Sequence, residues 1–322
     1  MIDCHIHYAA SLEDERLNAI ISQYKMEGVV LQCIPKGNHM PTNAEALAYK
    51  KKSAVPVYVM GGLPREVYGS QEADLPGQLR MELYRLMDMG CTGIKMLEGK
   101  PNVRKAYPIP DFDRPVWDGF WDELEREQIP VLFHVNDPEE FWDPFKVTET
   151  AKKFGWFYDG SYVNNEDQYA QVLKVLERHP SLRVCFPHFF FMSKQLERLA
   201  GILDRYQNVM IDLTPGVELY INLSACSRKS GDFFERYQNR ICFGTDIGAR
   251  QVIADRDVPL SLEESRARVC LIRNFLENDG GYVLNPDSYY HGQPVAMHGL
   301  GLPGRIRQKI YHDNILRFLK VI

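Results

Sequence analysis

Met-Ile-Asp-Cys-His-Ile-His, residues 1–7, places an aspartate and two histidines at alternating positions of a short apolar segment. Side chains at alternating positions of a β-strand point to one face, so His5 and His7 can both reach one metal ion. Two buried imidazoles can instead be hydrogen-bonded residues of an ordinary core. The segment therefore predicts a buried strand, with a metal site and a plain hydrogen-bonded pair as the two interpretations.

Outward from this segment, short β-rich runs alternate with longer segments of helical periodicity. The candidate strands span residues 2–7, 29–34, 57–61, 93–97, 131–135, 184–188, 209–213 and 241–245. The segments with helical periodicity include residues 12–26, 43–52, 75–89, 117–127, 166–177 and 194–206. This alternation indicates parallel βαβ units, and eight such units predict a (β/α)8 TIM barrel. A doubly wound sheet is the alternative, because strand count alone does not show closure.

No Pro/Gly/Ser-rich linker separates two cores, so we expect a single domain over residues 1–322. Two connections exceed those of a minimal barrel. The first, residues 136–165, is rich in aromatic residues, and the second is an irregular stretch, residues 279–302, after a helix near 262–278. Loops that follow the strands form the catalytic face of a barrel, so both insertions are expected to cap the substrate.

Composition excludes several classes of partner. The net charge is −5 without a Lys/Arg run, so nucleic acid is not an expected partner. The apolar runs are too short to cross a bilayer. Seven scattered cysteines without a Cys-x-x-Cys motif indicate reduced thiols, and the histidine pair leaves no room for a preceding signal peptide. We expect a soluble, cytoplasmic protein.

Polar residues recur where other apolar strands end: His134, His188 and Asp246. An ionisable group at the end of a buried strand needs a partner, and one divalent cation would satisfy several at once. Each residue alone could be a hydrogen-bonded core residue. The repetition of one register by these three, together with His5 and His7, favours a metal site.

With this ordered series the sequence resembles the amidohydrolase superfamily, most closely its branch with aminocarboxymuconate semialdehyde decarboxylase and pyrone dicarboxylate lactonase. The resemblance covers nearly the whole chain. It rests on Asp3-x-His5-x-His7, Gly93-Ile94-Lys95, His134, His188, residues 208–213, residues 240–246 and the terminal helix around residues 314–319.

The resemblance implies a ligand set for one divalent metal ion, expected to be zinc: His5, His7, His134 and Asp246. Such a set leaves a position open, and zinc lowers the pKa of a bound water to about 7. The resemblance further implies that His188 orients or deprotonates this water. Asp246 would accept its proton as general base and return it to the leaving group.

For two further residues, Asp3 and Lys95, the resemblance leaves two interpretations each. Asp3 resembles a residue that fixes a ligand from behind, with a plain turn role as the alternative. In related two-metal hydrolases a lysine at the position of Lys95 is carbamylated, so a second ion held by Lys95 and His188 is one interpretation. We favour one ion, with Lys95 facing an anionic substrate.

Candidate substrate contacts lie on the same face: Lys95, Trp142, Tyr158, Phe189 and Arg250. After the histidine of strand 6 the family usually has a small, glycine-rich turn. Here bulky residues 189–192 follow it, so we expect a narrower and partly apolar pocket.

The leading hypothesis is a hydrolase that uses metal-activated water on an amide, cyclic amide or lactone of a small carboxylated substrate. The alternative is a metal-dependent, non-oxidative decarboxylase of a small unsaturated or aromatic acid. A noncatalytic barrel that keeps the ion for structure is disfavoured, because structural zinc sites are usually closed by four ligands and have no open position facing a pocket built by loops. The expected partner is a small molecule, and a homodimer is expected by analogy with similar proteins.

Overall fold

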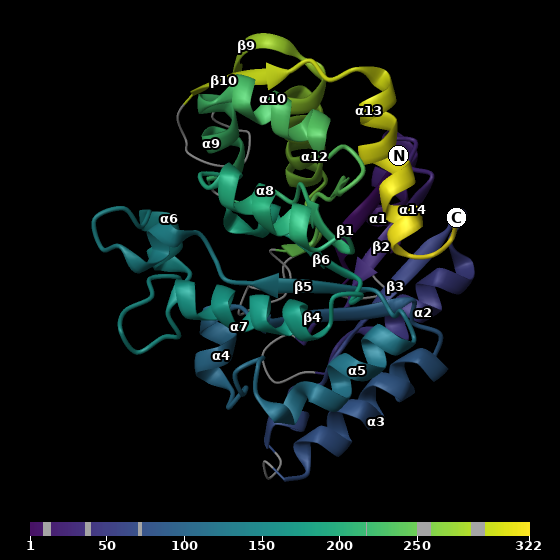
Figure 1. Cartoon of the computed structure of the whole chain (residues 1–322). Coiled ribbons are helices and arrows are strands. Elements are labelled where there is room, and N and C mark those ends of the chain that lie inside the picture. Colours follow the sequence, from purple (N-terminus) through teal and green to yellow (C-terminus); the bar gives the residue numbers. More distant parts are fainter. Residues whose placement is uncertain (9–13, 36–39, 70–72, 217, 250–258, 285–293) are drawn as a thin grey trace.

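The computed structural model describes residues 1–8, 14–35, 40–69, 73–216, 218–249, 259–284 and 294–322 (Figure 1). Eight parallel strands pair in chain order in one sheet. They are β1 (Ile2–His7), β2 (Gly28–Gln32), β3 (Val57–Gly62), β4 (Gly93–Gly99), β5 (Val131–Val135), β6 (Val184–Phe186), β7 (Val209–Asp212) and β8 (Ile241–Cys242). Val29, Val30 and Leu31 are buried on both faces of the sheet, as expected when helices cover the outside.

Backbone hydrogen bonds between β1 and the segment that begins with β8 close the sheet. The N–H of Cys4 donates to Phe243 (2.9 Å), and the N–H of His7 donates to Ile247 (2.8 Å). In the opposite direction, the N–H of Asp246 donates to the carbonyl oxygen of His5 (2.8 Å). The sheet is thus a barrel, which confirms the (β/α)8 fold and excludes the doubly wound sheet.

Helices surround the barrel, and their bounds agree closely with the helical periodicity of the sequence. They are α1 (Asp14–Gln23), α2 (Asn43–Lys52), α3 (Leu75–Asp88), α4 (Pro101–Ala106), α5 (Asp118–Arg126), α6 (Glu149–Lys153), α7 (Asn165–Arg178), α8 (Leu196–Arg205), α9 (Leu219–Ala225), α10 (Ser227–Arg236), α12 (Leu262–Glu277), α13 (Gly304–Gln308) and α14 (Asn314–Phe318). None of the helices in these described ranges is long and apolar enough to span a bilayer.

The expectation of an irregular stretch after α12 was wrong for its two ends. Asp279–Leu284 (β9) and Val295–Leu300 (β10) form an antiparallel hairpin that packs against α9, α10 and α12 (Figure 1). The paired glycines at 280 and 281 hide the strand in the sequence because glycine has low strand propensity. Val283 on its outer face is exposed, so β9 lacks a continuous apolar pattern.

The C-terminal helix α14 packs against side chains that point from the strands into the barrel. Ile315, Leu316, Phe318 and Leu319 form one buried cluster with side chains from the strands: Ile2, Cys4, Val30, Met60, Leu132, Cys185, Met210 and Cys242. The guanidinium of Arg183, just before β6, donates to the carbonyl oxygen of Phe318 at the end of the helix (2.9 Å). Helix α14 therefore completes the apolar core that these strand side chains form inside the barrel.

We predict that Phe318→Ala lowers the free energy of unfolding by about 3–5 kcal/mol, the range for removing a buried phenylalanine ring. Phe318 is 2% exposed, whereas Val321 nearby is 47% exposed, so Val321→Ala is the matched control and should change little. Urea unfolding followed by circular dichroism measures both. Equal effects of the two substitutions would show that α14 does not contribute to the core as described.

Candidate metal centre

The centre begins with an irregularity in β1. The pairing of β1 with β2 shifts register between Asp3 and Ile6, and the side chain of Gln32 donates to the carbonyl oxygen of Cys4 inside this bulge (2.7 Å). The Asp3 carboxylate accepts from the N–H of His5 (3.0 Å) and from the N–H and hydroxyl of Thr245 (3.1 and 2.5 Å). Asp3 therefore ties the bend of β1 to the segment that carries Asp246.

Three buried side chains converge above this bend. Oδ1 of Asp246 lies 3.2 Å from Nε2 of His7 and 3.6 Å from Nε2 of His5. One ligand atom from each of the three residues lies within 4.8 Å of the other two. Two imidazole nitrogens and one carboxylate oxygen are the donors that zinc and similar divalent ions take in catalytic sites, so the group fits such an ion.

Asp212 at the end of β7 fixes the ring of His5. Its Oδ2 lies 2.9 Å from Nδ1 of His5, and its Oδ1 accepts the N–H of His188 and of Thr214, each at 3.0 Å. A carboxylate partner places the proton of His5 on Nδ1 and leaves the Nε2 lone pair facing Asp246. Burial lowers the pKa of His5 well below its ordinary value, and Lys95 adds to this, so the ring is neutral.

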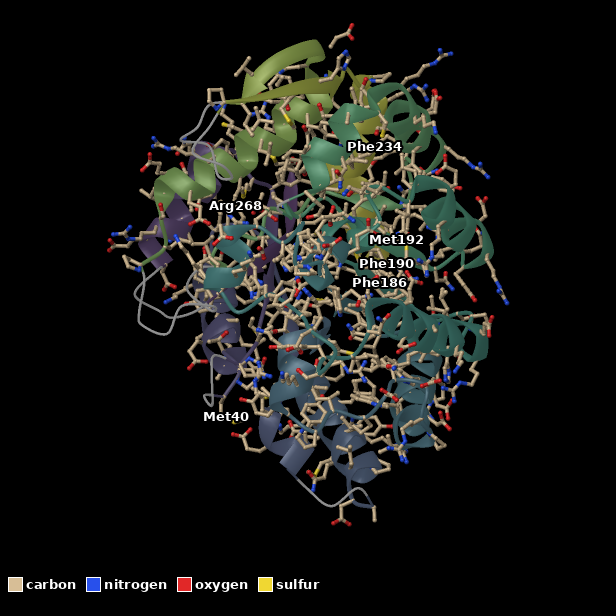
Figure 2. All side chains as sticks on the ribbon, turned by 90° about the vertical axis from the view of Figure 1, so that its left-hand side faces the viewer. Met40, Phe186, Phe190, Met192, Phe234 and Arg268 are labelled. Atoms are coloured by element: carbon tan, nitrogen blue, oxygen red, sulfur yellow. The ribbon has the colours of Figure 1, made fainter. Side chains whose placement is uncertain are left out.

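Arg268 of α12 holds the other oxygen of Asp246. Its guanidinium donates to the carbonyl oxygen of Thr245 (3.0 Å) and to Oδ2 of Asp246 (3.3 Å). Burial alone would raise the pKa of Asp246, but the hydrogen bond to His7 and the charge of Arg268 outweigh it and hold this pKa well below its ordinary value. Asp246 thus stays ionised, with Oδ1 turned to the histidines. Figure 2 labels Arg268.

Lys95 of β4 lies inside the barrel, beside His5. Its Nζ is 3.2 Å from Nε2 of His5, and the residue is 1% exposed. Burial lowers the pKa of Lys95 to about 8, although the carboxylates of Asp212 and Asp246 offset part of the effect. The amine therefore titrates close to neutral pH while it faces the ligand nitrogen of His5.

The ring of His188 lies beside that of His5, and the ring of His134 lies beside that of His188. The ring centroid of His188 is 6.0 Å from that of His5 and 5.1 Å from that of His134. Burial lowers the pKa of His134 to about 4 and that of His188 well below its ordinary value. Three of the four expected ligands thus converge in the structure, and His134 is not a member of that group.

The turn after β6 explains which phenylalanine reaches the centre. Residues 188–191 all have left-handed backbone angles, with φ between 53° and 58°. Such angles cost about 1–2 kcal/mol per non-glycine residue, so packing must offset them. Phe190 stacks on Phe186 at 3.9 Å between ring centroids, and both residues are labelled in Figure 2.

The turn sends Phe189 and Phe191 in different directions. Phe189, expected to contact substrate, instead packs 5.3 Å from the ring of Phe233 and 5.8 Å from that of Phe234, in the outer core. Phe191 stacks on His188 (4.9 Å, 18° between planes) and lies 5.4 Å from His134. Because the left-handed turn directs Phe189 to the outer core, Phe191 is the phenylalanine of this turn that lies beside the histidines and would make their surroundings apolar.

The aromatic insertion forms a small core of its own beyond β5 (Figure 1, left). The ring centroids of Trp142 and Tyr158 lie 4.7 Å apart in this core. Both residues also line a cavity of about 800 Å³ on the side of α7. The residues that line this cavity do not include His5, His7 or Asp246. Arg250 lies outside the described residues.

Sequence reasoning did not assign roles to Asp212, Arg268 or Asp137. Asp212 ends β7 as His134 ends β5, and that register is the signal that could have found it. Arg268 interrupts the buried face of a helix, which is a weaker signal. Asp137 stands two residues after β5, and both of its oxygens accept from the Nζ of Lys100, a pairing that only the fold reveals.

Comparison with known proteins gives one family and several similar structures. A family model described as amidohydrolase matches residues 74–321, whereas no curated protein matches the chain. A probable 2-pyrone-4,6-dicarboxylic acid hydrolase from Acinetobacter baumannii is 11% identical, with a TM-score of 0.56 over 99% of this chain and 98% of that one.

Two decarboxylases are similar to the same degree. The 2,6-dihydroxybenzoate decarboxylase from Rhizobium is 13% identical, with a TM-score of 0.55 over 99% of this chain and 98% of that one. A dihydroxybenzoic acid decarboxylase from Polaromonas sp. JS666, solved with manganese and the inhibitor 2-nitroresorcinol, is 12% identical, with a TM-score of 0.57 over 99% and 96% of the two chains. At such identities the likeness shows the shared fold alone.

We predict that the Lys95 ammonium loses its proton near pH 8 in the metal-free protein, because burial disfavours the cation. Below this pH the side chain is charged, and above it the neutral amine dominates. Nitrogen-15 NMR of labelled lysines measures the midpoint, and Lys95→Arg identifies the resonance. A midpoint above pH 10, where exposed lysines titrate, would contradict the description of this site.

Proposed function

We propose, because this chain belongs to the amidohydrolase family, that it is a metal-dependent hydrolase of an amide, cyclic amide or lactone in a small carboxylated substrate. The family match confirms the resemblance found in the sequence. The observation that carries the proposal is the convergence of His5, His7 and Asp246 at the closure of the barrel.

We infer that these three residues hold one divalent ion, which we expect to be zinc, and that His134 completes the set. Manganese, present in the Polaromonas enzyme, is the second ion to test. When bound, the ion supplies a Lewis acid and an activated water. A neutral His5 and an ionised Asp246 are the protonation states that metal binding requires of these two residues.

Asp246 and His188 are the two groups placed to move the proton in this proposal. Arg268 occupies Oδ2 of Asp246, so only Oδ1 is left for the reacting water. The ring of His188 is neutral and lies beside those of His5 and His134, where it can orient or deprotonate the water, and Asp246 would return the proton to the leaving group. Asp3 would act indirectly, by fixing the backbone of His5.

The substrate side combines one cation with an apolar wall. Lys95, when protonated, would attract a carboxylate, while the stacked rings of His188 and Phe191 suit a flat, unsaturated portion of the substrate. Trp142, Tyr158 and Arg250 stay predicted substrate contacts, and the insertions at 136–165 and 279–302 stay predicted caps. A homodimer and a cytoplasmic location also stay predictions.

The second candidate function is the decarboxylation of a small aromatic acid. The flat wall made by Phe191 and His188 favours it, since an aromatic acid could stack there while its carboxylate faces the histidines. The similar decarboxylases from Rhizobium and Polaromonas give further support by analogy.

We predict that the zinc-loaded protein hydrolyses at least one carboxylated lactone or cyclic amide in a panel that also contains unsaturated acids as candidate decarboxylase substrates. Acid release and carbon dioxide are followed in parallel, so that the panel separates the hydrolase from the decarboxylase.

Asp246→Asn should lower kcat by at least about 100-fold, because it removes a ligand and a proton acceptor. Arg273→Lys on the outer part of α12 is the control and should keep the parent rate. Parent activity in Asp246→Asn would rule out its role.

We further predict one bound ion per chain when the protein is prepared with bicarbonate. A second ion would need Lys95 as a carbamate together with His188. The ε-nitrogen of Lys95 lies 3.2 Å from Nε2 of His5, the nitrogen that would hold the first ion. Elemental analysis gives the ratio, and mass spectrometry detects a carbamate. Two ions with a modified Lys95 would replace the single-ion proposal.

A further inference from the structure

We propose that Asp137 is a positioning residue for His134. Lys100, from the loop after β4, and Tyr158, from the aromatic insertion, hold the carboxylate of Asp137 in place. The proposal rests on the proposed function in one respect, namely that His134 presents a ring nitrogen to an ion or a substrate. It gives residues 136–165 a role in the centre itself, besides that of a cap.

The carboxylate of Asp137 is the hub of a buried polar cluster. Asp137 is 3% exposed, and the Nζ of Lys100 donates to both of its oxygens, at 2.6 Å each. The hydroxyl of Tyr158 donates to Oδ2 at 2.5 Å. Lys100 in turn lies over the ring of Trp156, 4.8 Å from its centroid. Charge-assisted hydrogen bonds of this kind are short and strong, so the carboxylate is fixed before any ligand binds.

One edge of the His134 ring faces this cluster. Its Nε2 lies 3.5 Å from Oδ1 of Asp137, and this buried nitrogen has no hydrogen-bond partner within the described residues. The distance exceeds that of a hydrogen bond by a few tenths of an ångström, which a small ring rotation closes. Because an ionised carboxylate can only accept, the nitrogen that faces it carries the proton. The Nδ1 lone pair of His134 is then the one available to an ion or substrate.

The neighbouring His5 has the opposite arrangement. Its Nδ1 faces the carboxylate of Asp212 at 2.9 Å, and its Nε2 faces Asp246. Two buried carboxylates therefore assign opposite tautomers to two histidines of one centre. A carboxylate behind a ligating histidine both fixes its tautomer and raises its basicity, and its loss typically weakens metal binding about 10–100-fold.

The cluster also links the insertion mechanically to the centre. Asp137, Trp156 and Tyr158 belong to the insertion, whereas Lys100 follows β4 and His134 lies in β5. Packing between Tyr158 and Phe141 (6.2 Å between ring centroids) joins the cluster to the insertion's own small core. A change in the insertion would thus reach His134 through Asp137 rather than through the substrate.

The test measures the tautomer of His134 directly. Long-range proton–nitrogen correlation NMR of the full-length, metal-free protein with labelled histidines distinguishes the two tautomers, and His134→Gln assigns the resonance. We expect His134 to carry its proton on Nε2 and His5 on Nδ1. In Asp137→Asn the ammonium of Lys100 loses its partner and can donate to Nε2, so His134 should shift to the Nδ1 tautomer.

Metal affinity gives the second readout, from competition between the protein and a chromophoric chelator for zinc. Asp137→Asn should bind zinc about 10–100-fold more weakly than the parent. Tyr158→Phe leaves Lys100 on the carboxylate and should keep the tautomer with a loss of less than about 10-fold. Asp143→Asn is the matched control, because Asp143 lies in the same insertion and pairs with Lys146 at the surface. It should change neither readout.

The outcomes separate this proposal from the proposed function. A proton on Nδ1 of His134 in the parent protein overturns the proposal, and this measurement needs no variant to fold. Unchanged tautomer and affinity in Asp137→Asn overturn it as well. If the parent binds neither zinc nor manganese while Asp137→Asn still changes the tautomer, the positioning role stands and the metal-dependent function falls. Metal-dependent turnover by a parent protein whose His134 is protonated on Nδ1 would support that function and overturn the positioning role.

Discussion

The closure of the barrel is the constraint on which the rest of the molecule depends. The N–H of Asp246 donates to the carbonyl oxygen of His5, and the N–H of His7 donates to Ile247, so residues far apart in the chain become neighbours in one ring of strands. Neither the histidine pair nor Asp246 could form a site alone. The carboxylate of Asp3 accepts hydrogen bonds from Thr245 and from the backbone of His5, and so stabilises the junction of the two segments that carry the histidine pair and Asp246.

Buried acids then set the chemistry of the histidines. Asp212 and Asp137 each stand behind one ring, while Arg268 takes one oxygen of Asp246 and leaves the other turned inward. A low-dielectric interior makes unpaired charges costly, so each of these groups is paired or aimed at the centre. As a result the buried rings of His5, His134 and His188 stay neutral, while Asp246 keeps its charge inside the barrel.

The fold could be predicted from the sequence because it depends on local periodicity, and alternating apolar runs mark the strands. His5 and His7 lie on β1 and Asp246 follows β8, so strand order brings them together, whereas their role as ligands rests on the family resemblance. The partners behind them could not be predicted in this way. The contact of Arg268 with Asp246 joins α12 to the segment after β8, and that of Lys100 with Asp137 joins two neighbouring loops, so both depend on tertiary packing. Phe189 was misplaced for a local reason, since bulky residues rarely adopt left-handed angles.

The left-handed turn at residues 188–191 has a consequence for the order of assembly. Its backbone is unfavourable in isolation, and its compensation comes from rings on other elements, among them Phe186, Phe233 and Phe234. The turn can therefore settle only after α10 and β6 have docked. His188 and Phe191 reach their places with it, so the reactive part of the barrel is expected to order late in folding, on a scaffold that is already formed.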